Sequence, residues 1–320
     1  MMTGLLHRTN PRFNLVLFTS LVLVLAGIGA MVMLLLASWV YGVPMNEFQQ
    51  WMMQTGDPSV VQALVWMNNI SQVVTFLLPP LFLVLLVGTE SVGKFMLNHP
   101  GKFLLVAPLW LIASGSLIDF ASQFNAWIIP ENSPLGSYFS EMEKTAEDLT
   151  HAMLNIPGSS GVLLGILSIV IIPAFCEEFL FRGTLQPLLA RITGRMHLSV
   201  WMTAAIFAFI HFQFYGMIPR MILGAMLGYL VVWSGSLWTS VAAHMINNAM
   251  AMIVYYRYGD LTTPASSEPG EDVWAHILSL VVFALLTSLL LRWSKWSLIR
   301  DRYLGKNSSP AIPLEDPTGT

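Results

Sequence analysis

Long apolar stretches alternate with short polar ones along most of the chain. A helix needs about 20 apolar residues to cross a bilayer, so this pattern predicts membrane-spanning helices. We expect eight spans, at about 13–41, 70–88, 103–117, 161–189, 198–214, 218–233, 237–256 and 273–291. The first stretch is about twice as long as the apolar part of a signal peptide, and we therefore expect it to remain as a membrane anchor.

The segments between these stretches differ in character. Segment 44–67 mixes acidic residues with Trp and Met, which predicts an amphipathic helix at the membrane interface. Pro79 and Pro80 are expected to break or kink the second span, because both lack a backbone donor. Segment 119–156 is acidic with interleaved apolar residues and is expected to be partly helical and extramembrane. The basic, then Pro-, Ser- and Gly-rich end after residue 291 predicts a disordered tail.

Composition supports a membrane protein. Hydrophobic residues make up 55% of the 320 residues and charged residues 10%, and the mean hydropathy is +0.65. We therefore expect an all-α, polytopic membrane protein with about eight transmembrane helices and a polar intramembrane cavity. The net charge of −3 is spread over the loops and indicates no nucleic-acid partner. The bilayer is the expected partner, and the sequence does not indicate an oligomeric state. Cys176, the single cysteine, is expected to be a buried packing residue.

Basic residues predict the orientation in the membrane. Lys and Arg gather in alternate loops when the predicted spans are counted from the amino terminus, whereas the acidic loops fall on the other side. The basic positions are Arg8, Arg12, Lys94, Lys102, Arg191, Arg195 and those of the tail. Because cytoplasmic loops carry the excess of Lys and Arg, both termini are predicted to be cytoplasmic.

The most informative stretch is Cys176-Glu-Glu-Phe-Leu-Phe-Arg182, which places charges at the end of an apolar run. Ionisable groups inside such a segment are costly unless they are paired or functional. Glu178 and Arg182 are four residues apart and share a helix face, so they are predicted to pair. Glu177 points about a quarter turn away and has no built-in partner. We interpret it as a desolvated carboxylate that can take a proton from water.

Two later apolar segments also contain polar side chains. His211 follows Phe207 by four residues, and Asn248 follows His244 by four, so each pair shares a helix face. A lone histidine on an apolar helix is more often a packing residue than a catalyst. Three separate spans that bring polar groups inside favour a shared site, because buried polar groups need one another as partners.

These motifs resemble those of a known protease family. Glu-Glu-x-x-x-Arg at 177–182, Phe-x-x-x-His at 207–211 and His-x-x-x-Asn at 244–248 follow one another on successive hydrophobic segments, as in the type II CAAX prenyl proteases and the bacterial CPBP or Abi intramembrane proteases. The resemblance covers about residues 163–256. It implies that the first Glu and first His activate water, that the second His and the Asn stabilise the oxyanion, and that the Arg is structural. Carried over, these residues are Glu177, His211, His244, Asn248 and Arg182, with Glu178 beside them.

The function predicted from this resemblance is an intramembrane endopeptidase that cuts a peptide or membrane-protein substrate near the membrane. We divide the chain into amino-terminal helices at 1–156, a catalytic core at 157–258 and a last helix with a tail at 259–320. The compact loops resemble those of bacterial members, which predicts the bacterial plasma (inner) membrane. Glu177, His211 and His244 would make an acceptable zinc set with one open position. Since no His-Glu-x-x-His spacing is present, we favour water attack without a metal or other cofactor.

Two other functions stay open at this point. A transporter or ion pathway could use the same Glu, His and Arg residues as a buried relay, although the repeated halves typical of transporters are not seen. An inactive scaffold or immunity-type protein could keep the motifs for packing. Straight spans also place Glu177 near the inner face and His211 near the outer one. The two come together if the fourth span continues through Pro187, or if the fifth runs past Phe214.

Overall fold

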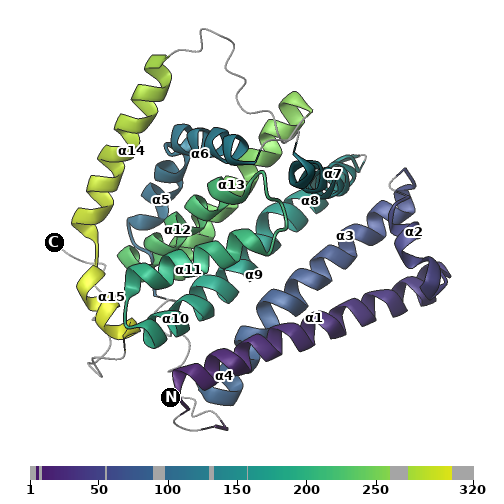
Figure 1. Ribbon diagram of the computed structural model, residues 1–320, viewed down its shortest axis with the longest axis horizontal. Coiled ribbons are helices and arrows are strands. Elements are labelled where there is room, and N and C mark those ends of the chain that lie inside the picture. The colour runs from purple at the N-terminus through teal and green to yellow at the C-terminus, as the bar shows by residue number, and fades with distance from the viewer. Residues whose placement is uncertain are drawn as a thin grey trace.

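The computed structural model describes residues 5–6, 9–54, 56–88, 98–129, 133–156, 158–259 and 273–304. The elements along these residues are helical, which confirms the all-α prediction (Figure 1). The helices are α1 (Pro11–Tyr41), α2 (Phe48–Met52), α3 (Pro58–Gln72), α4 (Leu78–Val87), α5 (Phe103–Ile112), α6 (Gly115–Ile128), α7 (Pro134–Leu154), α8 (Gly158–Gly165), α9 (Ile172–Leu180), α10 (Gln186–Thr193), α11 (Met196–Phe209), α12 (Met217–Ser234), α13 (Leu237–Tyr258), α14 (Val273–Trp293) and α15 (Trp296–Tyr303).

Several helical runs are long and apolar enough to cross a membrane, which confirms a polytopic membrane protein. Over the described residues there are five: Pro11–Tyr41, Pro58–Val87, Gly158–Thr193, Met217–Ser234 and Val273–Trp293. A sixth results if α5 and α6, which are bent by 44° at their junction, count as one span. The other two of the eight expected spans correspond to α11, which has only 14 residues, and to α13, which is less apolar.

The long runs stay continuous across their prolines because wider helical turns precede them. Proline removes a helix hydrogen bond and clashes with the carbonyl four residues earlier, and a π-helical turn accommodates both effects. Such turns lie at Val73–Leu77 before Pro79, at Ile166–Ile171 before Pro173 and at Phe181–Leu185 before Pro187. The break expected at Pro79 and Pro80 is therefore a π-helical turn within one run, and both prolines are buried.

The predicted interfacial helix at 44–67 is wrong. The main chain starts a new helix at Pro58, where the Asp57 carboxylate accepts the Ser59 N–H at 2.8 Å as an N-cap. From there α3 continues into α4 as one 30-residue run. The prediction failed because Asp57, taken as an interfacial acid, is the N-cap of this run.

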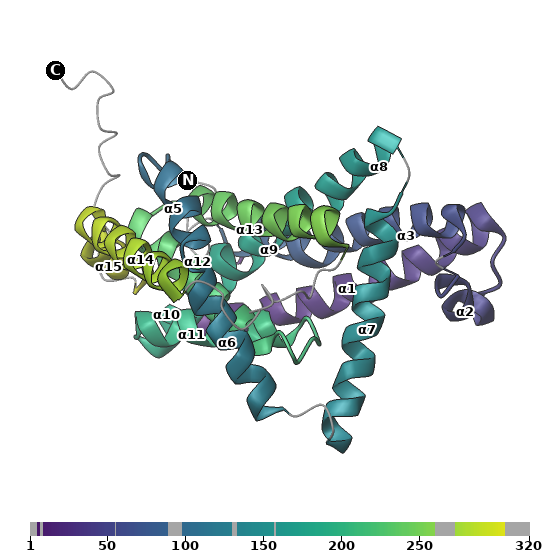
Figure 2. The ribbon, with the colours of Figure 1, turned by 90° about the horizontal axis from the view of Figure 1, so that it is seen from above.

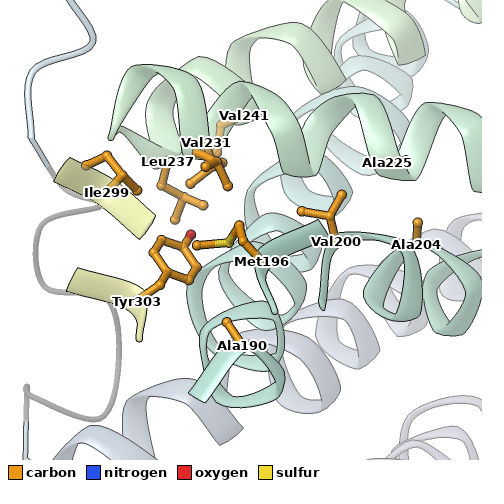
Figure 3. Packing of buried hydrophobic residues seen from close by; sticks show 11 residues of the cluster. Ala190, Met196, Val200, Ala204, Ala225, Val231, Leu237, Val241, Ile299 and Tyr303 are labelled. Carbon is orange, nitrogen blue, oxygen red and sulfur yellow. The ribbon is translucent and has the colours of Figure 1, made fainter. Parts of the chain in front are cut away.

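Two other boundaries also differ from the prediction. Helical structure does not end near residue 117, because α6 follows α5 after a 44° bend and runs on to Ile128. The first part of the expected disordered tail is helical and forms α15. Ile299 and Tyr303 of this helix are fully buried against the core (Figure 3). Arg8, Glu131, the loop with Glu90 and Lys94, residues 260–272 and residues 305–320 lie outside the described residues. The three-part division of the chain stays a prediction.

The interior of the molecule is built around α12. Within the protein, 61% of α12 is buried, compared with 6% of the most apolar 18-residue stretch of α14, so α12 is central and α14 is peripheral. α12 packs on α6, α11 and α13, and α9 packs on α3 and α13. α1, α3 and α4 form one flank, and α14 lies at the opposite edge (Figure 1). Figure 2 shows α6 and α7 extending away from the bundle on one side.

Candidate active site

The run Gly158–Thr193 carries the first motif in its middle. This run is 36 residues long and continues through Pro187, so Glu177 lies deep within it. Of the two alternatives raised by the sequence, the structure follows the longer fourth span. Glu177 is only 5% exposed and Glu178 is fully buried. Two adjacent carboxylates in the core of a membrane protein need specific partners.

Glu178 holds most of these partners. Its Oε1 accepts from Arg182 Nη1 at 2.6 Å and faces His244 Nδ1 at 3.0 Å, and its Oε2 accepts the Ser240 hydroxyl at 2.5 Å. The pairing of Glu178 with Arg182, four residues on, was predicted and is confirmed. A carboxylate with a cation, an imidazole and a hydroxyl on its two oxygens is well compensated for its burial. Glu178 therefore joins α9 to α13.

Arg182 extends this network to α12. Its Nη2 donates to the carbonyl of Gly224 at 2.9 Å, and its guanidinium carbon lies 4.6 Å from the centre of the Phe207 ring. One turn on, Gln186 Nε2 donates to the carbonyl of Gly228 at 3.3 Å. Small residues at both α12 positions let the helices approach closely, since a Cβ at Gly228 would lie 2.6 Å from Gln186 Oε1.

The Phe207 ring brings the three motifs together. Besides Arg182, its neighbours are the His211 ring at 4.9 Å and the His244 ring at 6.0 Å between centroids. His211 Nδ1 lies 2.7 Å from the carbonyl of Phe207, one turn earlier. A carbonyl only accepts hydrogen bonds, so Nδ1 carries the proton and the neutral ring keeps a lone pair on Nε2. The Phe-x-x-x-His spacing thus fixes both the position and the tautomer of His211.

His244 is oriented by the same reasoning. Its Nδ1 faces the carboxylate of Glu178, which accepts, so this nitrogen is the donor. The other nitrogen, Nε2, is then an acceptor in the neutral ring and a donor in the imidazolium. The arrangement allows His244 either to accept a proton or to stabilise a developing negative charge, depending on its own charge.

Glu177 has a different environment from its neighbour. No salt bridge joins it to a cation among the described residues. It lies within electrostatic range of His244, Arg182 and Arg220, and the side-chain amide of Gln72, in α3, faces it. It is thus the buried carboxylate without its own counter-ion that the sequence indicated.

Asn248 has a contact that the sequence did not suggest. Its Nδ2 donates to the carbonyl of Ile169 at 3.0 Å. In a regular helix this carbonyl would accept the N–H of the residue four positions on, which is Pro173 and has no N–H. Asn248 therefore donates to a carbonyl that Pro173 cannot reach as a donor. Asn248 and His244 both contact the run Gly158–Thr193. Asn248 contacts it at Ile169, and His244 contacts it nine residues later, at Glu178.

Three site residues were missed by the sequence analysis: Ser240, Gln72 and Arg220. Ser240 lies one turn before His244, so the same spacing argument could have found it. Gln72 and Arg220 belong to other helices, and no sequence spacing connects them to Glu177. Cys176 is buried, as expected for a packing residue.

The proposed metal ligands do not form a metal site in this structure. In the part of the chain that the structure describes, no three or more His, Cys, Asp or Glu side chains are arranged to hold a metal ion. Glu177, His211 and His244 therefore do not fit zinc as they stand, and we derive no step through a metal. Two surface pockets of about 700 and 550 Å³ lie elsewhere, at Ile253–Tyr258 and beside His197 and Trp296.

The class of protein is thus a polytopic, all-α membrane protein with a buried polar centre. This centre contains two carboxylates, an arginine and two imidazoles near one aromatic ring. Residues 159–250 match the family model "Type II CAAX prenyl endopeptidase Rce1-like". This match spans all three motifs and confirms the resemblance, so residues 159–250 are similar to that family.

One curated relative matches part of the chain. The chain is 32% identical over 89 residues to "Uncharacterized protein YpbD" of Bacillus subtilis (strain 168). The aligned part is 27% of this chain and 42% of that relative, so the chain spans less than half of the relative's length. No solved structure matches the chain.

Proposed function

We propose that the protein is an intramembrane endopeptidase in which Glu177 activates water for attack on a peptide bond. The main support is that two adjacent buried carboxylates differ in their hydrogen-bond and ion-pair partners. Glu178 forms an ion pair with Arg182 and hydrogen bonds with Ser240 and His244, whereas Glu177 has no ion pair among the described residues. A carboxylate that is not engaged in an ion pair has oxygen lone pairs available to accept a proton from water.

The reaction needs a base, a positioned water and a donor for the developing charge. Glu177 takes a proton from water, and the resulting hydroxide attacks the peptide carbonyl carbon. His211 assists by accepting a hydrogen bond from this water through Nε2, which its contact with the Phe207 carbonyl leaves unprotonated. When the tetrahedral intermediate collapses, the C–N bond breaks and protonated Glu177 returns its proton to the leaving amine.

The oxyanion is assigned to His244 and Asn248. Protonated His244 keeps one N–H on Glu178 and directs the other, at Nε2, to the oxyanion. Asn248 uses one of its two amide hydrogens on Ile169 and has the second available. Glu178 and Arg182 hold these groups in place. The substrate is a peptide or membrane-protein segment, and the location is the plasma membrane of a bacterium, with both termini in the cytoplasm.

Comparative membrane proteomics of cells with the active protein and with Glu177→Gln tests this function. Glutamine keeps the size of the side chain but cannot take a proton. We expect a peptide or membrane protein to accumulate uncut with Glu177→Gln, and not with Glu141→Gln, an exposed acid on α7 changed in the same way. The proposal is refuted if the Glu177→Gln protein is folded in the membrane and the peptide profile of these cells is unchanged. A change in ion flux without any cleavage difference would instead support a transporter.

A further inference from the structure

The turn that carries His211 is held by helices outside the family match. This turn, residues 210–216, joins α11 to α12 and is called the His211 turn below. Directly after His211, Phe212 has a φ of 53°, a left-handed conformation that costs a non-glycine residue about 1–3 kcal/mol. Such a conformation persists only where surrounding contacts determine it. The contacts around the turn therefore decide where His211 lies.

Asn125, in α6, makes the most specific of these contacts. It is fully buried, and its Nδ2 donates to the carbonyl of Phe214 at 2.9 Å. Its Oδ1 accepts the N–H of Ile218, also at 2.9 Å. Both ends of one amide are thus bound to the main chain on either side of the junction between the turn and α12. This arrangement fixes the amide orientation, and an ionised carboxylate in its place could not donate to the Phe214 carbonyl.

The helix α7 holds the same turn from another direction. Glu143 Oε2 accepts the N–H of Tyr215 at 3.0 Å, and the hydroxyl of Tyr215 donates to the carbonyl of Gly136 at 3.2 Å. The rings of Phe139 and Phe214 stack with centroids 4.1 Å apart. The amphipathic helix α7 lies outside the candidate spans. These contacts anchor it to the turn that carries His211, the histidine predicted to assist Glu177.

Arg220 completes the support from α12. Its guanidinium donates to the main-chain carbonyl of Gln213 at 3.2 Å and to the side-chain oxygen of the same residue at 2.7 Å. It also lies within electrostatic range of Glu143, Glu177 and His211. The cation therefore links the anchor on α7 with the buried acid of the site.

We propose that Asn125 and Glu143 are positioning residues for His211, acting through the His211 turn. This inference rests on the proposed function, and it places two functional residues before the segment 159–250 that matches the family. Losing either contact allows Phe212 to relax out of its left-handed conformation, and the imidazole moves with it. A displacement of about 1 Å in a reacting group can cost on the order of 10²-fold in rate.

Histidine ring NMR of the purified full-length protein in lipid nanodiscs tests the position of His211 without any turnover. With ¹⁵N-labelled histidine, the signals of His211 are identified among seven histidines by their loss in His211→Gln. We expect Asn125→Asp and Glu143→Ala to shift the His211 ring signals, and Glu143→Gln, which keeps an acceptor for Tyr215, to leave them close to wild type. Matched controls are Gln123→Glu and Glu141→Ala, exposed positions on the same two helices.

Turnover of the peptide found by the membrane comparison provides the second measurement. Asn125→Asp and Glu143→Ala are expected to lower kcat by about tenfold or more with KM within about twofold, whereas Glu143→Gln keeps the activity. Unshifted His211 signals in both variants overturn the inference, as does an equal loss in Glu143→Gln and Glu143→Ala. If Asn125→Asp does not fold, the Glu143 pair decides alone. Failure of the proposed function would appear separately, as unchanged cleavage by Glu177→Gln.

Discussion

Removing the cation from the buried network is the most direct test of the site's architecture. In Arg182→Met a side chain of similar length fills the space but donates no hydrogen bond. Glu178 then loses the partner at 2.6 Å on Oε1, and the carbonyl of Gly224 loses its donor at 2.9 Å. His244 and Ser240 remain on the carboxylate.

The expected cost is large because both partners are fully buried. Breaking a buried ion pair by removing one member typically costs about 3–5 kcal/mol, since the other charge stays uncompensated in the interior. Neutralising that charge as well recovers much of the loss. In Glu178→Gln/Arg182→Met we therefore expect a smaller cost than the sum of the two single substitutions, with a coupling energy of about 1–3 kcal/mol.

Unfolding of the purified protein in mixed micelles, followed by tryptophan fluorescence and circular dichroism, measures these free energies. Arg195→Met, on an exposed arginine shortly after the same helix, is the control and should stay within about 0.5 kcal/mol of wild type. A cost below about 1 kcal/mol for Arg182→Met, or strictly additive single and double variants, would refute the view that Glu178 depends on this cation.

Two further predictions concern helix contacts around the site. Burial raises the pKa of the Glu143 carboxyl, so docking of α7 is strongest below the usual range of a glutamate and weakens as the pH rises through the raised pKa. Limited proteolysis of α7 across pH should show this trend in wild type and a flat profile in Glu143→Gln; a rise in protection with pH would contradict it. Gly228→Ala should destabilise by about 1–3 kcal/mol because its Cβ would meet Gln186, whereas Gly27→Ala, with open space around it, should not. Equal unfolding free energies for the two alanine variants would be inconsistent with close helix packing.

Residue spacing predicted those parts of the site that lie within a single helix. The Glu178–Arg182 pair and the Phe207–His211 turn follow from positions four apart, and the structure contains both. Spacing also placed His244 and Asn248 on one face. It could not reveal that Asn248 donates to the Ile169 carbonyl in the run that carries Glu177.

Contacts between distant segments could not be predicted in this way. Asn125 and Glu143 lie in a stretch that reads only as acidic and mixed, because the sequence carries no signal for the turn that they contact 72 to 93 residues later. The span boundaries failed for a related reason. The acidic residues of segment 44–67 look interfacial when that segment is considered alone, but Asp57 caps a helix that continues into a long apolar run.

The π-helical turn at Phe181–Leu185 has an evolutionary consequence. Glu178 reaches across to α13 before this turn, and Gln186 reaches α12 after it. A π-helical turn closes with a bond to the fifth residue on instead of the fourth, so it holds one residue more than an α-helical turn. A homologue with one residue fewer at this point could therefore form a regular α-helix and keep both contacts in nearly the same register, and alignments that place a one-residue gap here are geometrically acceptable.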